Sequence, residues 1–591
     1  MNGSIVPWLL LAISTISIFS DVAMASASSQ CLGVDQRSLL LELRNSLVFD
    51  SYVSSKLVHW DQGADSWSGV TCEDGLMVGL DLSKESISGG IDDSLNLAFN
   101  NFNATTIPSG LANLSRVAYL NLSYAGFTGH IPTKLSRLTK LRTLDLPDKA
   151  TSLIGDLGEL RELYLDGVDV FAEGSEWCDI LSSSVPKLEV LSMSYCSLSG
   201  PINASLMSLA NLLVIQLDGN NLSSIVPRFL ANFSSLKTLS LYDCDLQGEF
   251  PHEIFQVQTL QTLDLSSNEL LQGSLPEFQE NGSLQTLVLS FTNISGRLPD
   301  SIGNLKNLSR IELKRCGFDG NIPSSFTNLS QLSYLFSSNN FTGPIPSLNK
   351  SKNLIQIIMY NNSLIGQIDS TQWESLSSLL ILDLQSNLLE GNIPSSLFTH
   401  PSIEELLLSN NQFSGQLKGS FDAPSHMLKA LDLSNNNMGG ELPTSIWELR
   451  GLNELFLSSN NFSGSFHINS IQQLRNLSIL HLSYKRFSID ATNTASQASS
   501  FPELTLLHLA SCQLMTLPQF LVNQSMLRFL DLSHNYIQGD IPRWIWTPKY
   551  LMNLNLSSNS FEDFETPLGN FSSTLVVVDL HSNMLRGNLP P

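Results

Sequence analysis

Charge and cysteine are scarce in this chain. Of its 591 residues only 14% are charged and only seven are cysteines, too few for disulfide bonds to hold a chain of this length together. The 31 Lys and Arg residues are outnumbered by 54 Asp and Glu residues, and the formal net charge of −23 argues against a nucleic-acid partner, because phosphates require a basic face. Beyond the N-terminal leader, no apolar run reaches the roughly 18 residues that a membrane-spanning helix needs.

Motifs for catalysis are missing as well. His481, His508, His534 and His581 lie near expected strands but share no metal-ligand spacing such as HExxH. No nucleophile elbow of the GxSxG type, phosphate-binding loop or kinase lysine motif occurs. We therefore expect no enzyme activity, no cofactor and no metal site.

What the chain does have is one repeated pattern, LxxLxLxxNxFxGxIP. Its first strand residue, called the anchor below, recurs every 24 residues at Ile215, Leu239, Leu263, Leu287 and Ile311. A unit this short cannot bury its apolar face alone and must stack on copies of itself. The period therefore predicts a solenoid whose function lies on a surface.

The copy from Leu260 to Pro276 shows how one winding is built. Leu263 and Leu265 alternate with polar residues, which predicts a short strand with the leucines inward. Asn268 follows where the chain turns, and stacked copies of it can bond the backbone groups that the turn leaves unpaired. We expect a leucine-rich-repeat solenoid with a parallel sheet on the concave face, an irregular or 3₁₀ convex side, a right-handed superhelix of the α/β type, and an N-terminal helical cap.

The pattern predicts about 22 coils. At about 4.8 Å per strand, their sheet would extend on the order of 100 Å along its arc. The anchors are Leu80, Leu95, Leu120, Leu144, Leu163, Leu191, Ile215, Leu239, Leu263, Leu287, Ile311, Leu335, Ile357, Leu382, Leu406, Leu431, Leu455, Leu480, Leu507, Leu530, Leu554 and Val578.

Irregular spacings predict local disturbances of the repeat. The first two anchors are too close for a full coil, and an insertion around Trp177 and Cys178 lengthens another. The strand at Leu335 is one residue short, which predicts local strain. The segment 488–500, rich in small polar residues, is expected to be an unstructured surface loop.

The N-terminus predicts secretion. Ile5 to Phe19 is apolar and of signal-peptide length, and small-x-small cleavage patterns follow it, although no basic residue precedes it; the run is too short for a membrane anchor. We predict a signal peptide at 1–25, a leucine-rich-repeat cap at 26–78, and a solenoid at 79–591 that is truncated at its C-terminus.

Sequons for asparagine glycosylation agree with the same compartment. None of those between Leu160 and Arg315 falls on an expected concave strand, whereas Asn121 and Asn555 do. The candidates for modification are Asn103, Asn113, Asn203, Asn221, Asn232, Asn281, Asn293, Asn307, Asn328, Asn340, Asn461, Asn476, Asn523 and Asn570, and the motif also occurs at Asn349 and Asn361.

The cysteines divide by position. Cys196, Cys244, Cys316 and Cys512 occupy the position of Asn268, where we expect small buried thiols. Cys31 and Cys72 bracket the expected cap and are candidates to form a disulfide with each other, while Cys178 has no assigned partner.

Outward strand positions in the middle of the chain suggest a binding surface. Most coils fill these places with Ser, Asn or Asp, but the middle coils carry aromatic and basic residues, which commonly anchor protein interfaces. Scattered surface aromatics are the competing interpretation. The candidate ligand-binding residues are Tyr164, Asp166, Tyr195, Asp218, Tyr242, Asp243, Phe291, Lys314, Arg315 and Tyr360.

Several segments resemble plant leucine-rich-repeat receptors. CLGVDQRSLLLELRNSL from Cys31, with KLVHW and WSGVTC ending at Cys72, is similar to their N-terminal cap. LRELYLDGVDV at 160–170, EWCDILSSSVPKLEVLSMSYCSLSGPI at 176–202 and LASCQLMTLPQFLVNQSMLRFLDLSHNYIQGDIPRWIW at 509–546 resemble receptor-like proteins of the Verticillium-wilt-resistance type. The resemblance implies a plasma-membrane immune receptor without a kinase domain, which senses a microbial protein and signals through partner receptor kinases.

The chain departs from that family at both ends. The adjacent cysteine pair usual in the cap is replaced by Ala64, Asp65 and Ser66, and the sequence stops at Pro591 before any further repeats or membrane helix. We expect a microbial, fungal protein or peptide as ligand and a leucine-rich-repeat co-receptor or adaptor kinase as partner. The expected location is the plasma membrane if the native protein extends past Pro591 and the apoplast otherwise. The alternative is a secreted inhibitor of an extracellular enzyme, as polygalacturonase-inhibiting proteins are.

Overall fold

The computed structural model describes most of the chain from residue 174 onward. The described residues are 174–280, 282–332, 337–369, 373–417, 421, 423–483, 487–492, 501–565 and 574–586, with shorter stretches between 41 and 168. The chain divides into two compact units, one formed by Met1–Phe171 with Ile180–Cys196 and the other by Ala172–Asp179 with Ser197–Pro591. Each unit is described by itself below. The predicted signal peptide and Cys31 lie outside the described residues.

In the first unit, four short parallel strands stack one per winding. Leu120, Leu144, Leu163 and Leu191 are the middle residues of these strands, pair in register and are buried. The strands are β5 (Tyr119–Asn121), β7 (Thr143–Asp145), β9 (Glu162–Tyr164) and β10 (Val190–Ser192).

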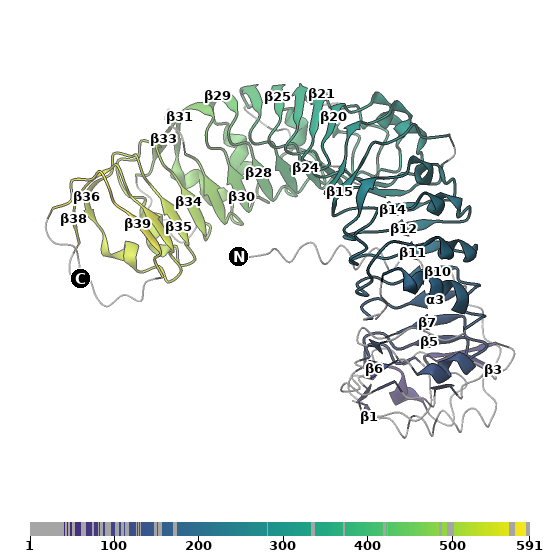
Figure 1. Ribbon diagram of the computed structural model, residues 1–591. Coiled ribbons are helices and arrows are strands. Elements are labelled where there is room, and N and C mark those ends of the chain that lie inside the picture. The colour runs from purple at the N-terminus through teal and green to yellow at the C-terminus, as the bar shows by residue number, and fades with distance from the viewer. Residues whose placement is uncertain are drawn as a thin grey trace. The chain divides into compact units, whose positions relative to one another are not determined.

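The second unit continues the same pattern in two parallel sheets, which together form what we call its anchor row (Figure 1). The predicted anchors from Ile215 to Val578 lie at the middle of these strands, except Leu335, which lies outside the described residues. The first sheet holds β11 (Val214–Gln216), β12 (Thr238–Ser240), β14 (Thr262–Asp264), β16 (Thr286–Val288) and β19 (Arg310–Glu312). The second holds β22 (Gln356–Ile358), β24 (Ile381–Asp383), β26 (Glu405–Leu407), β28 (Ala430–Asp432), β30 (Glu454–Phe456), β32 (Ile479–His481), β34 (Leu506–His508), β35 (Phe529–Asp531), β37 (Asn553–Asn555) and β39 (Val577–Asp579).

Every anchor-row strand whose following turn is described leads into a left-handed turn. Four residues after the anchor, the backbone adopts a positive φ, as at Ser267 (57°), Ser386 (54°) and Asn410 (55°). This conformation reverses the chain direction and aims the following residue into the interior. It also explains why the strands are short, since a residue with positive φ cannot continue a strand.

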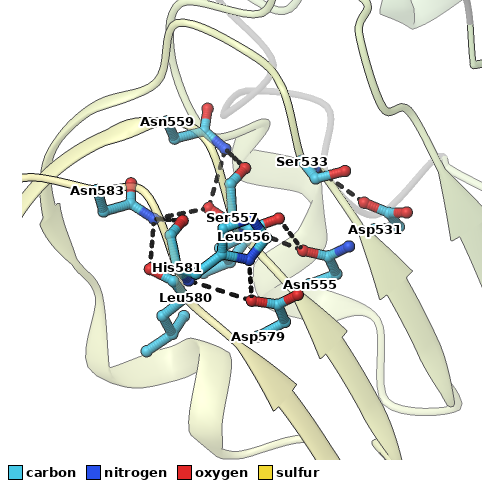
Figure 2. Close-up of polar contacts among 10 residues, drawn as sticks. All are labelled: Asp531, Ser533, Asn555, Leu556, Ser557, Asn559, Asp579, Leu580, His581 and Asn583. Atoms are coloured by element: carbon cyan, nitrogen blue, oxygen red, sulfur yellow. Dashed lines mark hydrogen bonds and ion pairs between the residues drawn. The ribbon is translucent and has the colours of Figure 1, made fainter.

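The predicted asparagine ladder is confirmed. The Asn268 side-chain nitrogen donates to the Leu241 and Leu265 carbonyls, both at 2.8 Å, while its oxygen accepts from the Leu246 amide at 2.9 Å. Figure 2 shows the same bonds at Asn559 and Asn583, which both donate to Leu556 O. Each asparagine therefore joins two successive windings.

Cysteine replaces asparagine at four steps of this ladder, as predicted. Cys196, Cys244, Cys316 and Cys512 are buried, and none of the four forms a disulfide bond. The thiol donates to the carbonyl of the preceding winding, at 3.0 Å from Cys244 Sγ to Leu217 O. Burial raises the pKa of the Cys244 thiol to about 12, so the thiol form persists at neutral pH.

A second row of parallel strands, the return row, follows the ladder and was not predicted (Figure 1). Its inward side chains include Phe318, Phe341 and Phe413, which are fully buried, so the Phe of the repeat builds a second strand. Gly343, at φ 72°, ends one such strand where a Cβ would collide with the Asn321 side chain. The strands are β13 (Gln247–Glu249), β15 (Asn268–Gly273), β17 (Thr292–Ile294), β18 (Gly296–Arg297), β20 (Phe318–Asn321), β21 (Asn340–Gly343), β23 (Ser363–Gly366), β25 (Leu388–Gly391), β27 (Gln412–Gly415), β29 (Asn437–Glu441), β31 (Asn461–His467), β33 (Phe487–Asp490), β36 (Gln538–Ile541) and β38 (Ser560–Phe564).

Short 3₁₀ helices complete most windings, as predicted for the return path. In most of them a proline precedes the first turn, where its missing amide costs no hydrogen bond. They are η5 (Ala204–Ser208), η6 (Arg228–Asn232), η7 (His252–Gln256), η8 (Asp300–Asn304), η9 (Ser324–Asn328), η10 (Ser395–Leu397), η11 (Thr444–Glu448), η12 (Ile468–Gln473), η14 (Gln519–Asn523) and η15 (Arg543–Trp546), with η4 (Thr133–Arg137) in the first unit.

Two of the segments that were predicted to interrupt the repeat contain regular secondary structure where they are described. The insertion around Trp177 is the α-helix α3 (Glu176–Ser184), in which Trp177 and Cys178 are fully buried. The prediction of a loop from residue 488 is wrong at its start, because residues 488–490 belong to β33. Phe487 and Ile489 are buried there, and this alternation favours a strand; residues 493–500 lie outside the described residues.

The described part of the cap has its own small core. Trp60 and Trp67 stack with ring centroids 5.2 Å apart, and Trp60 Nε1 donates to Ser68 O. Strands β2 (Val70–Glu73) and β3 (Leu76–Leu80) pair antiparallel, with the second predicted disulfide cysteine, Cys72, on β2. The Cys31–Cys72 pairing stays a prediction, because Cys31 lies outside the described residues. Other described pieces are β1 (Val48–Phe49), β4 (Ile87–Ser88), η2 (Leu57–His59), β6 (Gly129–His130) and β8 (Ala150–Thr151).

Candidate binding surface

The sequence-predicted binding residues lie on the solvent side of the two units. Three of them, Tyr164, Asp166 and Tyr195, belong to the first unit, and the other seven belong to the second. Tyr164 ends β9, and burial raises the pKa of its hydroxyl. The Asp166 carboxylate accepts from the Ser194 amide at 2.7 Å and from the Ser192 hydroxyl, so its bonds serve the turn. Tyr195 is 58% exposed.

In the second unit, Asp218 has a similar structural task. Its carboxylate accepts from the Ser240 hydroxyl at 2.7 Å and from the Tyr242 amide at 2.9 Å. This pair of bonds fixes the backbone at Tyr242, whose side chain is half-buried. Asp243 follows in the left-handed turn with an exposed side chain.

The structure brings four of the predicted residues together. The Lys314 ammonium lies 5.7 Å from the ring centroids of both Phe291 and Tyr360, and the Arg315 guanidinium lies 5.6 Å from that of Phe291. Residues from three windings thus form one group, which we call the aromatic–cation cluster. Cations within about 6 Å of a ring face are attracted by its quadrupole. Burial alone would raise the pKa of Tyr360, but hydrogen bonds with Lys314 and Ser337 and the lysine charge bring it below its usual value.

Nine of the ten predicted residues lie after the strands on which they were expected, and only Tyr164 lies on one. Tyr195, Asp243, Phe291 and Arg315 occupy the left-handed turn, with φ between 50° and 60°. Most other described windings place Gly, Ser or Asn there, as at Gly219, although Phe99, Tyr124 and His534 also occupy this position. A non-glycine residue in this region costs on the order of 1 to 3 kcal/mol, and such strain concentrates at functional sites. The bulky side chains are retained at these positions despite that cost.

The described sequons leave this surface uncovered between β11 and β19. Asn203 caps η5, Asn221 follows the ladder, and Asn232 ends η6. Asn293 lies on the return-row strand β17, and Asn307 lies in the turn before β19. Among the described sequons of this stretch none falls on an anchor-row strand, while Asn281 lies outside the described residues.

Sequence reasoning missed one ion pair on the winding that carries Lys314 and Arg315. Arg310 on β19 lies 2.7 Å from the Glu312 carboxylate and is neutralised by it. The pattern of alternate outward residues on one strand could have shown this pair. Among the described residues no group of three or more His, Cys, Asp or Glu side chains is arranged to hold a metal ion. In the same residues, no helix has the length and apolarity to span a bilayer.

Comparison with known proteins agrees with this architecture. The Leucine Rich Repeat profile matches residues 187–209, 259–281, 283–305, 427–449 and 526–547. The fold is a leucine-rich-repeat solenoid. In these matches the anchors Leu191, Leu263, Leu287, Leu431 and Leu530 are the buried strand residues described above.

Curated relatives with the same repeats are receptor-like proteins of Arabidopsis thaliana. Receptor-like protein 6 is 31% identical over 271 residues, which cover 38% of this chain and 27% of that protein. Receptor-like protein 47 is 35% identical over 116 residues, covering 19% of this chain and 14% of that protein. The matched segments thus span about a quarter or less of those relatives. The homology supports a plant leucine-rich-repeat receptor-like protein.

Solved structures with the same fold are plant receptor ectodomains. The receptor kinase HAESA of Arabidopsis, solved in complex with the peptide hormone IDA and the co-receptor SERK1, has a TM-score of 0.67 and 25% identity, covering 94% of this chain and 95% of that one. The plant peptide hormone receptor RGFR1, in complex with RGF2, has a TM-score of 0.70 at 22% identity, covering 89% and 96%, and this likeness shows the fold alone.

Proposed function

We propose that this chain is the ligand-recognition ectodomain of a plant receptor-like protein in pathogen perception, which binds a microbial, fungal secreted protein or peptide on its anchor row. The observation that carries the proposal is the aromatic–cation cluster of Phe291, Lys314, Arg315 and Tyr360. Aromatic and Arg side chains dominate the energetics of protein interfaces. Here Phe291 and Arg315 occupy turn positions where glycine would cost less strain.

The chemistry of the cluster favours an extended polypeptide over a small molecule. Its residues come from three windings, and Arg315 is exposed while Phe291 and Lys314 are half-buried, so the surface is broad and open. The cations give it a local positive charge on a chain whose net charge is −23. A ligand with acidic and aromatic side chains would pair with both features.

The receptor-like relatives and the complexes of similar ectodomains support a partner kinase. HAESA was solved with both a peptide hormone and the co-receptor SERK1. We propose that this chain likewise acts through a leucine-rich-repeat co-receptor or adaptor kinase after ligand binding, at the cell surface or in the apoplast. The predicted signal peptide, glycosylation at the sequons listed above, and the domain bounds at residues 25 and 78 belong to this proposal.

Binding of candidate fungal secreted proteins to a variant with Tyr242, Phe291 and Arg315 all changed to Ala tests the surface. If each residue contributes about 1 to 2 kcal/mol, affinity falls at least 100-fold. The matched control changes the return-row residues Leu270, Leu388 and Glu390 to Ala. Equal affinity of the triple variant and the wild-type protein for a ligand that binds the wild type would refute the proposed surface.

Misfolding is separated from loss of binding by glycine variants. Phe291→Gly and Arg315→Gly remove the side chains and relieve the left-handed strain, and this gain offsets the extra entropy of glycine in the unfolded chain. The free energy of unfolding should therefore stay within about 1 kcal/mol of wild type. A variant that loses binding and keeps its melting temperature locates the effect at the surface.

A further inference from the structure

The second sheet of the anchor row carries apolar side chains on its solvent side. In β12 and β14 of the first sheet the outward strand residues are Thr, Ser and Asp. In β24 to β35, apolar residues take many of the equivalent places, and all of them are half-buried. They are Ile381, Leu407, Ala430, Phe456, Ile479, Leu506 and Phe529.

Acidic residues alternate with these apolar residues on β24 to β30. In the register of the sheet, Ala430 pairs with Glu405 on one side and Glu454 on the other. Asp432 pairs with Leu407 on one side and Phe456 on the other. Neighbouring strands lie about 4.8 Å apart, so carboxylates two strands apart are separated by about 10 Å. The result is an alternating array of carboxylates and apolar groups, which we call the acidic–apolar face.

The charges on this face are poorly balanced. On these four strands and the residue before each, the acids Asp383, Glu404, Glu405, Asp432 and Glu454 accompany one basic residue, Lys429. Lys429 lies 2.6 Å from Glu404. Burial, followed by the charges of Glu454 and Glu404, raises the pKa of Glu405, and burial with the charges of Glu405 and Asp432 raises that of Asp383 to about 6. The carboxylates therefore repel one another in the free protein.

Phe456, the aromatic residue at the end of this face, lies next to two histidines whose pKa values are lowered by burial. Phe456 meets His481 edge-to-face with centroids 6.3 Å apart, and His481 meets His508 at 4.8 Å. None of the anchor-row strands from β24 to β35 contains a sequon asparagine, since Asn461 lies on the return-row strand β31, Asn476 lies in a turn and Asn523 ends η14. An approaching polypeptide would meet side chains only.

We propose that the acidic–apolar face is a second docking surface, and that its partner is a polypeptide segment in which basic residues alternate with apolar ones. Charge complementarity selects the partner: lysine or arginine relieves the mutual repulsion of the carboxylates, while leucine-like side chains cover Leu407 and Phe456. The aromatic–cation cluster has the opposite sign and takes a different chemistry. The two surfaces therefore bind different partners, and this inference stands independently of the proposed ligand site.

Binding of two synthetic peptides to the full chain tests this surface. One peptide carries three Lys-Leu pairs between glycines, and its counterpart carries three Glu-Leu pairs. The basic peptide should bind the wild-type protein at least tenfold more tightly than the acidic one, and Glu405→Gln with Glu454→Gln should weaken its binding about tenfold. Glu390→Gln with Glu441→Gln, on the return-row strands β25 and β29, should leave it unchanged.

Two further variants keep the test decisive. Phe456→Ser should weaken the basic peptide, while Leu388→Ser, at a return-row position that is 44% exposed, should not. Because the Gln variants remove repulsion, their melting temperature should equal or exceed that of the wild type, which excludes misfolding as the cause of weaker binding. Equal affinity for both peptides, or full binding by the Glu405/Glu454 variant, would overturn the proposal. Loss of binding in the return-row controls would do the same.

Discussion

Removing one ladder asparagine should destabilise the solenoid by an amount that the structure lets us estimate. Asn436 donates to the carbonyls of Leu408, Leu433 and Ser434 at 3.0 to 3.1 Å and accepts from the Phe413 amide at 3.1 Å. We choose it because it is buried and both neighbouring windings are regular.

The bonds of Asn436 are not equally replaceable. The Leu408 carbonyl also accepts from Asn411, and the Leu433 carbonyl also accepts from Asn460, so both keep a donor after truncation. The Phe413 amide, by contrast, donates to the Asn436 side-chain oxygen itself, which truncation removes. A buried donor left without an acceptor costs about 1 to 3 kcal/mol, and the lost packing adds to that cost. Asn436→Ala should therefore lower the free energy of unfolding by about 2 to 4 kcal/mol.

Urea unfolding followed by circular dichroism measures this loss, and amide hydrogen exchange at Phe413 localises it. Asn437→Ala, the exposed neighbour, should change stability by less than about 0.5 kcal/mol. Asn436→Cys restores a donor toward Leu408 but no acceptor for the Phe413 amide, so it should recover less than half of the loss. Full recovery by cysteine, or equal effects of Asn436→Ala and Asn437→Ala, would refute the reasoning.

Three further predictions concern titratable groups. Burial and the neighbouring His508 charge lower the pKa of His481 to about 4, so near pH 6 the unfolded chain binds a proton at this histidine and the folded chain does not. The stability of the fold should therefore decrease as the pH drops from 6.5 to 4. His481→Gln should reduce this pH dependence of the melting temperature. Burial raises the pKa of Asp383 to about 6, so the stabilising contribution of its protonated form is present below pH 3.8 and lost as the pH rises through 6. Asp383→Asn should therefore raise the melting temperature at pH 8 and leave it unchanged at pH 3. A higher melting temperature of this variant at pH 3 would contradict the prediction. The raised pKa values of Cys178, Cys244 and Cys316, about 12, 12 and 11, keep these buried thiols protonated; mass spectrometry after iodoacetamide treatment should find them unmodified in the native protein and modified after unfolding.

Most of the solenoid could be predicted from the sequence because its period is a local property. The alternation around Leu263 and the polar residue five positions later fix the strand, the turn and the ladder within one winding. Cys244 could be placed in the ladder for the same reason. The return row could not, because β25 and its neighbours depend on hydrogen bonds between windings as well as on the alternation of the Phe of the repeat.

Only part of the candidate binding surface could be predicted from the sequence. Sequence spacing placed Phe291 and Arg315 on the correct side but on strands, since the left-handed turn reverses the simple two-residue alternation. The approach of Lys314 to Tyr360 spans two windings and depends on side-chain conformation. The acidic–apolar face around Glu405 was not predicted, because no single residue there departs from the repeat. The alternation of acidic and apolar side chains is visible only when the strands are aligned in register.

A glycan placed on the anchor row tests most directly whether that row is the recognition surface. Asp264→Asn creates the sequon Asn-Leu-Ser at the position where Asn555 carries it naturally, and Asn555 accepts from the Ser557 amide at 3.0 Å much as Asp264 accepts from Ser266 at 2.9 Å (Figure 2). The fold should therefore tolerate the change. Ligand affinity should be lost in the glycosylated protein and retained in Asp264→Asn with Ser266→Ala, which lacks the sequon. Undiminished affinity with the glycan shown to be attached at residue 264 would contradict the account.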